Sequence, residues 1–412
     1  MKEILLTEFE TEALIRSMTP MDIVIDSFQS TYQPDECKRK SINPPSDNSV
    51  PTYFREEAQG AFAAIINNII HLPDGNQAAF QPTTRYIRKL LQRYASIVEK
   101  YTLLENEHFA ELMMEYQFRT SEEGDDMPDP NASCHVSYIV PFDENFHENQ
   151  DEICQRGREC IVGIKVFPHH NDVGVRKVWE AGAALAEYLI ERPELVRGKT
   201  VCELGAGVGL TGIVISGLCQ TKSVHLTDYT EATLVNIEHN VKVNKKWVKN
   251  ARNEMMDTIF NEGQPVTSGY LEWEQFSEGV LDNAIEFPNV SESIHQTEAV
   301  SMEIAKRAQV LIAADVVYDR AVIPPLVSSV GRLLSESSEK IAIFATTYRN
   351  EETFALFEEE LNQAGIKCNY APRESTEKMN YIFPCYVDQP REDVRICTMS
   401  MTMTTQCNGM IC

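Results

Sequence analysis

The glycine-rich segment at residues 201–212 constrains this chain more than any other part of its sequence. A short apolar run, residues 201–204, leads into glycines at Gly205, Gly207 and Gly209, and a second apolar run, residues 213–218, follows them. Because glycine has no side chain and tolerates positive φ, the backbone can turn sharply here and lie against a bulky ligand. A strand, such a turn and then a helix are typical of nucleotide-like cofactor sites in α/β proteins.

Two carboxylates near this turn narrow the choice of ligand. Asp228 ends the next short apolar run, at about the distance where α/β cofactor sites bind ribose hydroxyls. Glu203 lies two residues before the first glycine and would repel a pyrophosphate. The pair favours S-adenosylmethionine, which has a positive centre and no phosphate, over a nicotinamide dinucleotide. We therefore expect Glu203 and Asp228 in the cofactor site of a methyltransferase, with a nicotinamide oxidoreductase as the alternative.

Composition excludes several other classes. The chain has 412 residues, which is long for one domain, and a formal net charge of −25, which argues against binding the phosphate backbone of nucleic acids. No apolar run approaches the roughly 20 residues needed to span a bilayer, and the acidic start does not resemble a signal peptide. Its 11 cysteines have no CxxC pair, so we expect reduced thiols and no metal site. These features predict a cytoplasmic enzyme with no nucleic-acid or membrane partner.

The N-terminal third has a helical pattern. We expect helices over residues 11–28 (interrupted at Pro20) and 56–72, helical structure across 83–117, and an acidic loop or linker around 121–131. We assign residues 1–133 to a helical module and residues 134–412 to a second domain.

From about residue 134 onward, strand and helix patterns alternate. Such alternation indicates a mostly parallel sheet covered on both faces, with its ligands beyond the carboxyl ends of the strands. We expect strands at 160–167, 201–204, 223–228, 270–273, 310–317, 340–346, from 366, and at 394–401, the last at a sheet edge. Residues 274–300 are acidic and weakly patterned, which indicates an insertion.

Asp315 and Tyr318 form the candidate acceptor site, directly after the apolar run at 310–317. Methyl transfer is an in-line displacement, and a lysine acceptor, with a pKa near ~10.4 in solution, must first lose a proton. A carboxylate can orient the incoming ammonium, and an aromatic face tolerates its positive charge. The alternative is that Asp315 caps the next helix and Tyr318 packs beside the sheet.

Several blocks of this sequence resemble the seven-β-strand protein-lysine methyltransferases. The blocks are residues 178–182, 203–209, 226–228, 236–240, 271–273 and Asp315-Val316-Val317-Tyr318. The resemblance implies a Rossmann-like, seven-stranded class I methyltransferase sheet and an N-terminal helical module. It implies that Asp315 to Tyr318 faces the target lysine. It also implies a cofactor site lined by Trp179, Gly205, Ala206, Gly207, Asp228, Trp273 and Ala314.

Residues 313–319, Pro324-Pro325 and residues 345–354 resemble the members that methylate elongation factor 2. The resemblance therefore implies elongation factor 2 as the protein partner. We expect the chain to be a monomer, and we expect its helical module to select the substrate. Two alternatives stay open: the same chemistry on another protein such as a chaperone, and a non-catalytic adaptor that keeps the fold. The segment after Glu274 departs from the compact family pattern.

Overall fold

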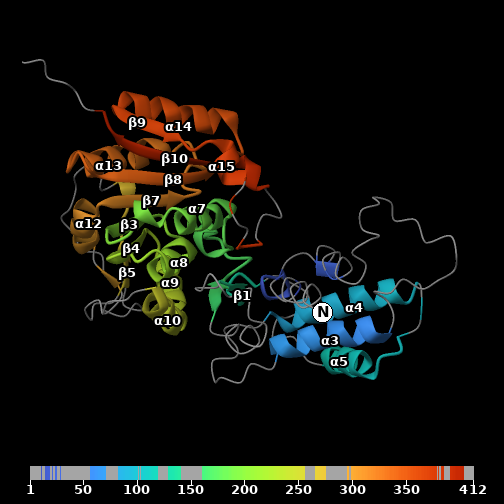
Figure 1. The fold of residues 1–412 in the computed structure, drawn as a ribbon. Coiled ribbons are helices and arrows are strands. Elements are labelled where there is room, and N and C mark those ends of the chain that lie inside the picture. The colour runs from blue at the N-terminus through green and yellow to red at the C-terminus, as the bar shows by residue number, and fades with distance from the viewer. Residues whose placement is uncertain are drawn as a thin grey trace, which may run out of the picture. The chain divides into compact units, whose positions relative to one another are not determined.

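The computed structural model forms two compact units (Figure 1). The first comprises residues 1–171 and 382–387, and the second comprises residues 172–381 and 388–412. The structure describes residues 11, 14–18, 21, 24–25, 28, 56–70, 82–100, 102, 104–118, 129–140, 160–255, 265–274, 295–296, 298–377, 379, 382–384 and 390–402. Most of the expected helix at 11–28, of the acidic loop and of the insertion after Glu274 lies outside these residues.

Three helices of the first unit are described along their length: α3 (Glu56–Ile70), α4 (Thr84–Val98) and α5 (Glu107–Phe118). They pack around an aromatic centre in which Phe62 stacks on Tyr94 at 4.2 Å and Phe109 meets the edge of Tyr94 at 5.4 Å. The helical pattern expected across 83–117 is two helices, because Asn106 starts the second one by accepting a hydrogen bond from the Phe109 amide.

A two-stranded antiparallel sheet also belongs to the first unit. It is formed by β1 (Cys134–Ile139) and β2 (Ile161–Val166), and Tyr138 of β1 packs edge-on against Phe383 at 5.2 Å. The strand expected at 160–167 is therefore present but pairs outside the large sheet. The compact units divide after Asn171, whereas our domain boundary at 133/134 is a sequence-based proposal.

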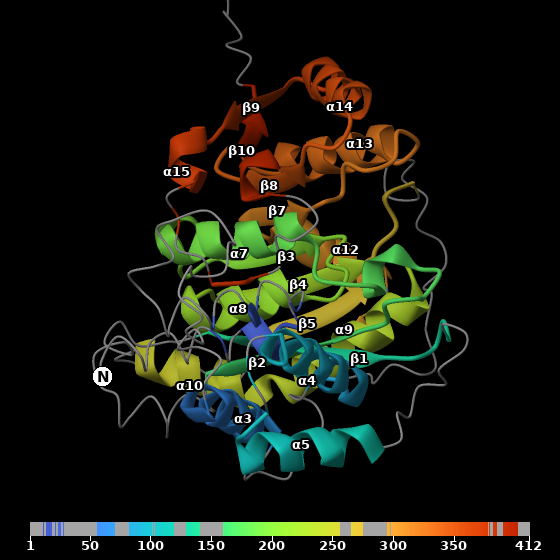
Figure 2. The same ribbon diagram turned by 90° about the vertical axis from the view of Figure 1, so that its right-hand side faces the viewer.

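The second unit is built on one large sheet with strand order β6-β5-β4-β3-β7-β8-β10-β9 (Figure 2). The strands are β3 (Thr200–Leu204), β4 (Ser223–Asp228), β5 (Val266–Tyr270), β6 (His295–Gln296), β7 (Val310–Ala314), β8 (Ile341–Thr347), β9 (Ile366–Tyr370) and β10 (Val394–Met401). The expected seven-stranded sheet is confirmed, with the two-residue strand β6 added at one edge. The strand expected at 270–273 lies earlier in the chain, at β5.

The position expected for β10 at a sheet edge is wrong. This strand lies between β8 and β9 and pairs antiparallel with both, from Val394 opposite Thr347 to Met401 opposite Ile366. The remaining pairs, from β6 to β8, are parallel. Alternating burial along β10 shows only that its two faces have different surroundings, which an internal strand also allows.

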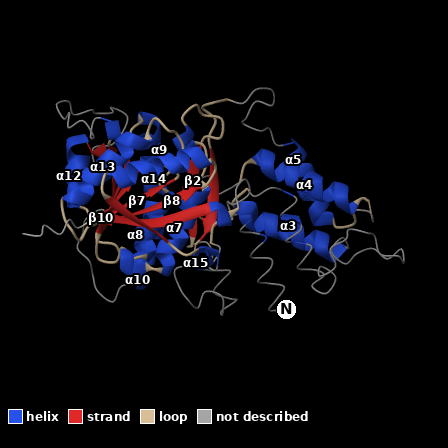
Figure 3. Ribbon diagram, turned by 90° about the horizontal axis from the view of Figure 1, so that it is seen from above, coloured by secondary structure: helices blue, strands red, loops and turns tan. Residues whose placement is uncertain are grey.

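Helices cover both faces of this sheet (Figure 3). They are α7 (Glu180–Glu191), α8 (Leu210–Leu218), α9 (Glu231–Val243), α10 (Lys245–Met255), α12 (Glu298–Arg307), α13 (Ile323–Ser335), α14 (Glu351–Gln363) and the short α15 (Arg373–Glu377). Every residue of α8 is buried, which explains why the sequence there is apolar on all sides rather than amphipathic. Within the described residues, no helix is long and apolar enough to cross a bilayer.

The glycine at the first turn of α8 lets this helix approach the sheet closely. A Cβ atom on Gly212 would lie 2.2 Å from Cδ2 of Leu226 and 2.7 Å from Oε2 of Glu203, both of which are buried side chains. Because neither neighbour has room to move, the absence of a side chain at this position sets the distance between α8 and β4.

We predict that Gly212→Ala lowers the free energy of unfolding by about 1–3 kcal/mol, the usual cost of overpacking a core. Gly331→Ala in α13 is the matched control, since a Cβ there would meet only Cδ1 of Ile366 at 3.6 Å. That substitution should leave stability unchanged or raise it by about 0.5–1 kcal/mol, as alanine favours a helix. Urea unfolding of both variants checks this, and equal effects would contradict the close-packing argument.

Candidate active site

The glycine turn lies at the carboxyl end of β3, between β3 and α8. Gly205, Gly207 and Gly209 have φ values of 66°, 55° and 81°, so all three occupy the left-handed region that favours glycine. A Cβ on Gly205 would lie 2.9 Å from Val316 Cγ1, and one on Gly207 would lie 3.0 Å from the Gly174 carbonyl oxygen. Ala206, between them, donates its amide to the Thr227 carbonyl at the end of β4.

Asp228, the last residue of β4, faces this turn. Its Oδ2 accepts a hydrogen bond from the Gly207 amide at 3.0 Å, and its Oδ1 accepts one from the Tyr229 amide at 2.8 Å. Burial raises the pKa of Asp228 to about 6, against the effect of these amides, and the charge of nearby Asp172 adds to the rise. Asp228 is thus fixed at the glycine turn, where we expected it.

Glu203 lies in β3, one residue before the end of the strand, and is 2% exposed. Its Oε2 accepts a hydrogen bond from the Gly212 amide in the first turn of α8 at 3.0 Å. Burial raises the pKa of Glu203 to about 8, although the bonds from Gly212 and Thr211 act in the opposite direction. The contact that the structure shows is with the helix, and contact with the cofactor stays a prediction.

The other expected cofactor residues lie at the same end of the sheet. The Trp273 ring, after β5, is next to Gly205, since its Cζ2 would be 3.2 Å from a Cβ there. Trp179 precedes α7 and is partly buried, and its Nε1 donates to the Val173 carbonyl at 3.2 Å. Ala314 is the last residue of β7 and approaches Gly182 of α7.

Asp315 follows β7 and adopts a left-handed backbone with φ 52°, which is uncommon for a residue with a side chain. Its Oδ1 accepts from the Thr347 amide at 2.9 Å, and its Oδ2 accepts from the Thr347 hydroxyl at 3.0 Å and from the Ala181 amide at 3.4 Å. The carboxylate therefore joins the end of β8 to the first turn of α7. Strained backbone of this kind persists where surrounding contacts fix it, often at functional sites.

Arg349, which we did not expect in the site, completes this arrangement. Its guanidinium donates to Asp315 at 3.0 and 3.3 Å and to Glu180 at 3.2 Å, and it lies over the Trp179 ring at 5.3 Å. Lys177 binds the other oxygen of Glu180 at 2.8 Å. The carboxylates of Asp315 and Glu180 are 5% and 1% exposed, so these two cations balance charges that would otherwise be buried alone.

Asp172 is a second residue that sequence reasoning missed. Its Oδ1 accepts from the Gly174 amide at 2.9 Å, and its Oδ2 accepts from the hydroxyls of Thr230 and Thr233 at the start of α9. The residue thereby holds the short helix η3 (Val173–Val175) beside the glycine turn. The spacing Asp-x-Gly is typical of a local turn of this kind and was the available signal.

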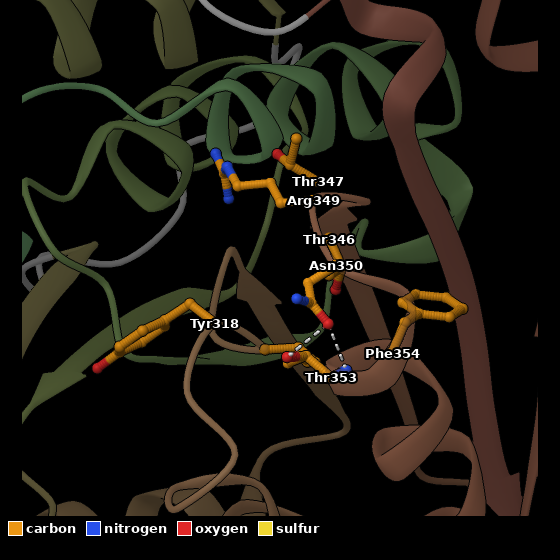
Figure 4. Close-up of a pocket in the computed structure, with 8 residues that line it drawn as sticks. Tyr318, Thr346, Thr347, Arg349, Asn350, Thr353 and Phe354 are labelled. Carbon is orange, nitrogen blue, oxygen red and sulfur yellow. Dashed lines mark hydrogen bonds between the residues drawn. The ribbon is translucent and has the colours of Figure 1, made fainter.

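Tyr318 is 49% exposed and lines a pocket with residues from the end of β8 and the start of α14 (Figure 4). Burial raises its pKa to about 12, and the negative charges of its neighbours, Asp228 among them, contribute. Its phenol is therefore neutral near pH 7 and presents an aromatic face rather than a phenolate base. Among the described side chains, no group of His, Cys, Asp and Glu is arranged to hold a metal ion.

Comparison with known proteins identifies the class of this site. Residues 168–275 match the family model described as lysine methyltransferase. The chain carries a lysine methyltransferase domain. The expected family and S-adenosylmethionine as the cofactor are thereby confirmed, because this family transfers the methyl group of that compound.

Three relatives illustrate how far the similarity extends. A putative uncharacterized protein of Dictyostelium discoideum is 26% identical over 313 residues, which cover 73% of this chain and 78% of that protein. The human protein-lysine N-methyltransferase EEF2KMT is 30% identical over 49% of this chain, and the human putative protein N-methyltransferase FAM86B1 is 32% identical over 46%. This chain spans 54% and 50% of the lengths of the two human proteins.

The residues present fit S-adenosylmethionine. The backbone at Gly205 and Gly207 carries no Cβ, so it can lie close to a ligand. Asp228 offers carboxylate oxygens for ribose hydroxyls, and the Trp273 ring offers a flat apolar face for adenine. Asp228, whose pKa of about 6 leaves its carboxylate charged near pH 7, suits a ligand with positive charge and no phosphate.

We predict that Glu203→Gln changes how the stability of the protein depends on pH. The Glu203 pKa rises from 4.5 to about 8 on folding, so its contribution to stability is fully present below pH 4.5 and is lost as the pH rises toward 8. Glutamine does not titrate. Relative to the wild type, the Gln variant should therefore gain stability between about pH 4.5 and pH 8, by at most about 5 kcal/mol.

Urea unfolding at pH 5, 6.5 and 8 measures this difference. Glu339→Gln is the control, because this carboxylate is exposed and its substitution should give the same small difference at all three values. A pH-independent difference for Glu203→Gln would contradict the raised pKa.

Proposed function

We propose that this chain is a protein-lysine N-methyltransferase that modifies a lysine of elongation factor 2. The observation that carries the proposal is the Asp315-x-x-Tyr318 segment, which follows the strand next to the glycine turn in a family that methylates lysine. The similarity to EEF2KMT proteins of human, mouse and cattle supports this substrate. The same chemistry on another protein such as a chaperone is the alternative.

In the proposed reaction, bound S-adenosylmethionine would supply a methyl group, and its positive charge would pass from the sulfonium sulfur to the lysine nitrogen. The residues of the chain then have three tasks. The glycine turn, Asp228 and Trp273 hold the cofactor, and Asp315 orients the target amine, which must arrive without its proton. Tyr318 offers an aromatic face next to the positive charge of the lysine, a role that its neutral phenol permits.

The geometry of the site supports a non-catalytic adaptor less well than it supports an enzyme. An adaptor would need the fold but not a left-handed aspartate held by an arginine, two main-chain amides and a threonine hydroxyl. Keeping a strained residue so firmly in place has a cost that a reaction explains and a scaffold does not.

We further propose that the protein acts as a monomer in the cytoplasm and that the helical module, residues 1–133, selects the substrate. A large protein must be held so that one lysine among many enters the site, and that requires a second binding surface. The aromatic core of α3, α4 and α5 gives this module a structure of its own.

We predict that substitutions at Asp228 and Asp315 affect different constants. Asp228→Ala should weaken S-adenosylmethionine binding by about 1.5–3 kcal/mol, because the charge-assisted bonds to the ribose are lost. Asp315→Asn, which keeps an oxygen for the Thr347 amide, should lower the rate of methylation of purified elongation factor 2 far more than it lowers cofactor affinity.

Calorimetry with the cofactor and transfer of a radiolabelled methyl group measure the two constants. Equal loss of affinity and rate in Asp315→Asn would make Asp315 a cofactor or stability residue. If the wild-type protein binds the cofactor but labels a different protein in a lysate, the proposed methyl transfer stands and elongation factor 2 is rejected as its substrate.

We predict that a chain starting at Cys134 binds S-adenosylmethionine normally but loses methylation of intact elongation factor 2. Starting there keeps Tyr138 of β1 against Phe383 and so preserves the contacts of the two-stranded sheet of β1 and β2. Calorimetry and the methyl-transfer assay test both parts. Full activity on the intact substrate would show that residues 1–133 do not select it, and failure of cofactor binding would show that they are needed for the fold of the catalytic part.

A further inference from the structure

The residues of the pocket beside Tyr318 are not among those expected to bind the cofactor. The pocket is lined by Val317, Tyr318, Thr346, Thr347, Arg349, Asn350, Thr353 and Phe354. Two of these residues, Thr347 and Arg349, hold the Asp315 carboxylate from the other side. The pocket is therefore continuous with the acceptor segment, and whatever fills it lies next to the proposed position of the target lysine.

Asn350 gives this pocket a hydrogen-bond donor in a fixed direction. Its side-chain oxygen caps α14 by accepting from the Thr353 amide at 3.0 Å, and the Thr353 hydroxyl donates to it at 3.4 Å. Since the oxygen faces the helix, the amide nitrogen must face away from it. Figure 4 shows this nitrogen pointing to the side on which Tyr318 lies, and no acceptor for it is found among the described residues.

Phe354 and Tyr318 provide the apolar parts of the pocket on either side of Asn350 (Figure 4). The Phe354 ring is supported by Tyr348 at 5.1 Å and Tyr370 at 6.0 Å, so its position is set by other aromatic side chains. Aromatic rings held in this way bind apolar groups with little loss of side-chain entropy.

The charges near the pocket exclude an anionic occupant. Arg349 already binds two carboxylates, and Glu351 and Glu352 occupy the first turn of α14. A phosphate or an acidic side chain would meet repulsion there. A neutral amide donor between aromatic groups suits instead the carbonyl of an extended peptide with an uncharged side chain beside it.

We propose that this pocket binds the segment of the protein substrate next to its target lysine, with the Asn350 amide donating to a main-chain carbonyl and a neighbouring apolar side chain lying against Phe354. The inference rests on the proposed methylation of a protein lysine and adds the residues that recognise the polypeptide around it. Asn350 is here a substrate-binding residue, separate from its function as the cap of α14.

Three substitutions separate these two functions of Asn350. Aspartate and serine both cap helices well but lack the amide donor, whereas alanine lacks both. We expect Asn350→Asp and Asn350→Ser to keep the thermal stability of the wild type and to raise the KM for purified elongation factor 2 about three- to tenfold, as the loss of one hydrogen bond predicts. The kcat and the affinity for S-adenosylmethionine should stay unchanged, because a contact made equally before and during transfer affects only KM.

Phe354→Leu tests the apolar part in the same assay and should also raise KM at constant kcat. Glu359→Gln is the matched control on the exposed face of α14, away from the pocket, and its KM should equal that of the wild type. Wild-type KM in both cap-retaining variants would overturn the inference, as would an increase in Asn350→Ala alone, since that result assigns the effect to the cap. A wild-type protein that fails to methylate elongation factor 2 rejects the proposed substrate, and the same variants are then compared on the protein that it labels.

Discussion

The site depends on carboxylates that end three neighbouring strands and accept hydrogen bonds from backbone amides. Strands β4, β3 and β7 lie side by side, and each contributes one acid at or near its carboxyl end. Glu203 binds the amide at the start of α8, Asp228 binds two amides around the glycine turn, and Asp315 binds amides of α7 and β8. Because a loop cannot move without breaking such a charge-assisted bond, these acids fix the loops above the sheet.

This arrangement explains why buried carboxylates are tolerated here. A carboxylate without partners loses several kcal/mol on burial, whereas amides and cations recover part of that loss. Arg349 forms ion pairs with both Asp315 and Glu180, and Lys177 forms a second ion pair with Glu180. Among the residues that the structure describes, no cation forms an ion pair with Glu203 or Asp228, and burial raises the pKa values of both. With a pKa of about 6, Asp228 keeps a negative charge at the glycine turn near pH 7, which a positively charged ligand can balance.

Local sequence patterns predicted the elements of this fold well, and long-range contacts account for most of what they missed. Apolar runs and glycine spacing identified the strands and the turn at Gly205 to Gly209, because burial and positive φ constrain residue type directly. The partners of Asp315 are 134 and 34 residues away in sequence, at Ala181 and Arg349, so no pattern around Asp315 reveals them. The same holds for β10, whose neighbours on both sides are set by tertiary pairing.

The contact of Glu203 in the structure differs from the role that the sequence predicts for it. From the sequence, Glu203 is expected to repel a pyrophosphate, whereas the structure shows its Oε2 accepting a hydrogen bond from the Gly212 amide. One hydrogen bond relates the two effects, since a carboxyl oxygen beneath the first turn of α8 accepts the Gly212 amide and so occupies a donor that a phosphate would use. One amide of the helix end that binds phosphate in dinucleotide folds is thus already paired with Glu203, which favours a positively charged cofactor over a nicotinamide dinucleotide.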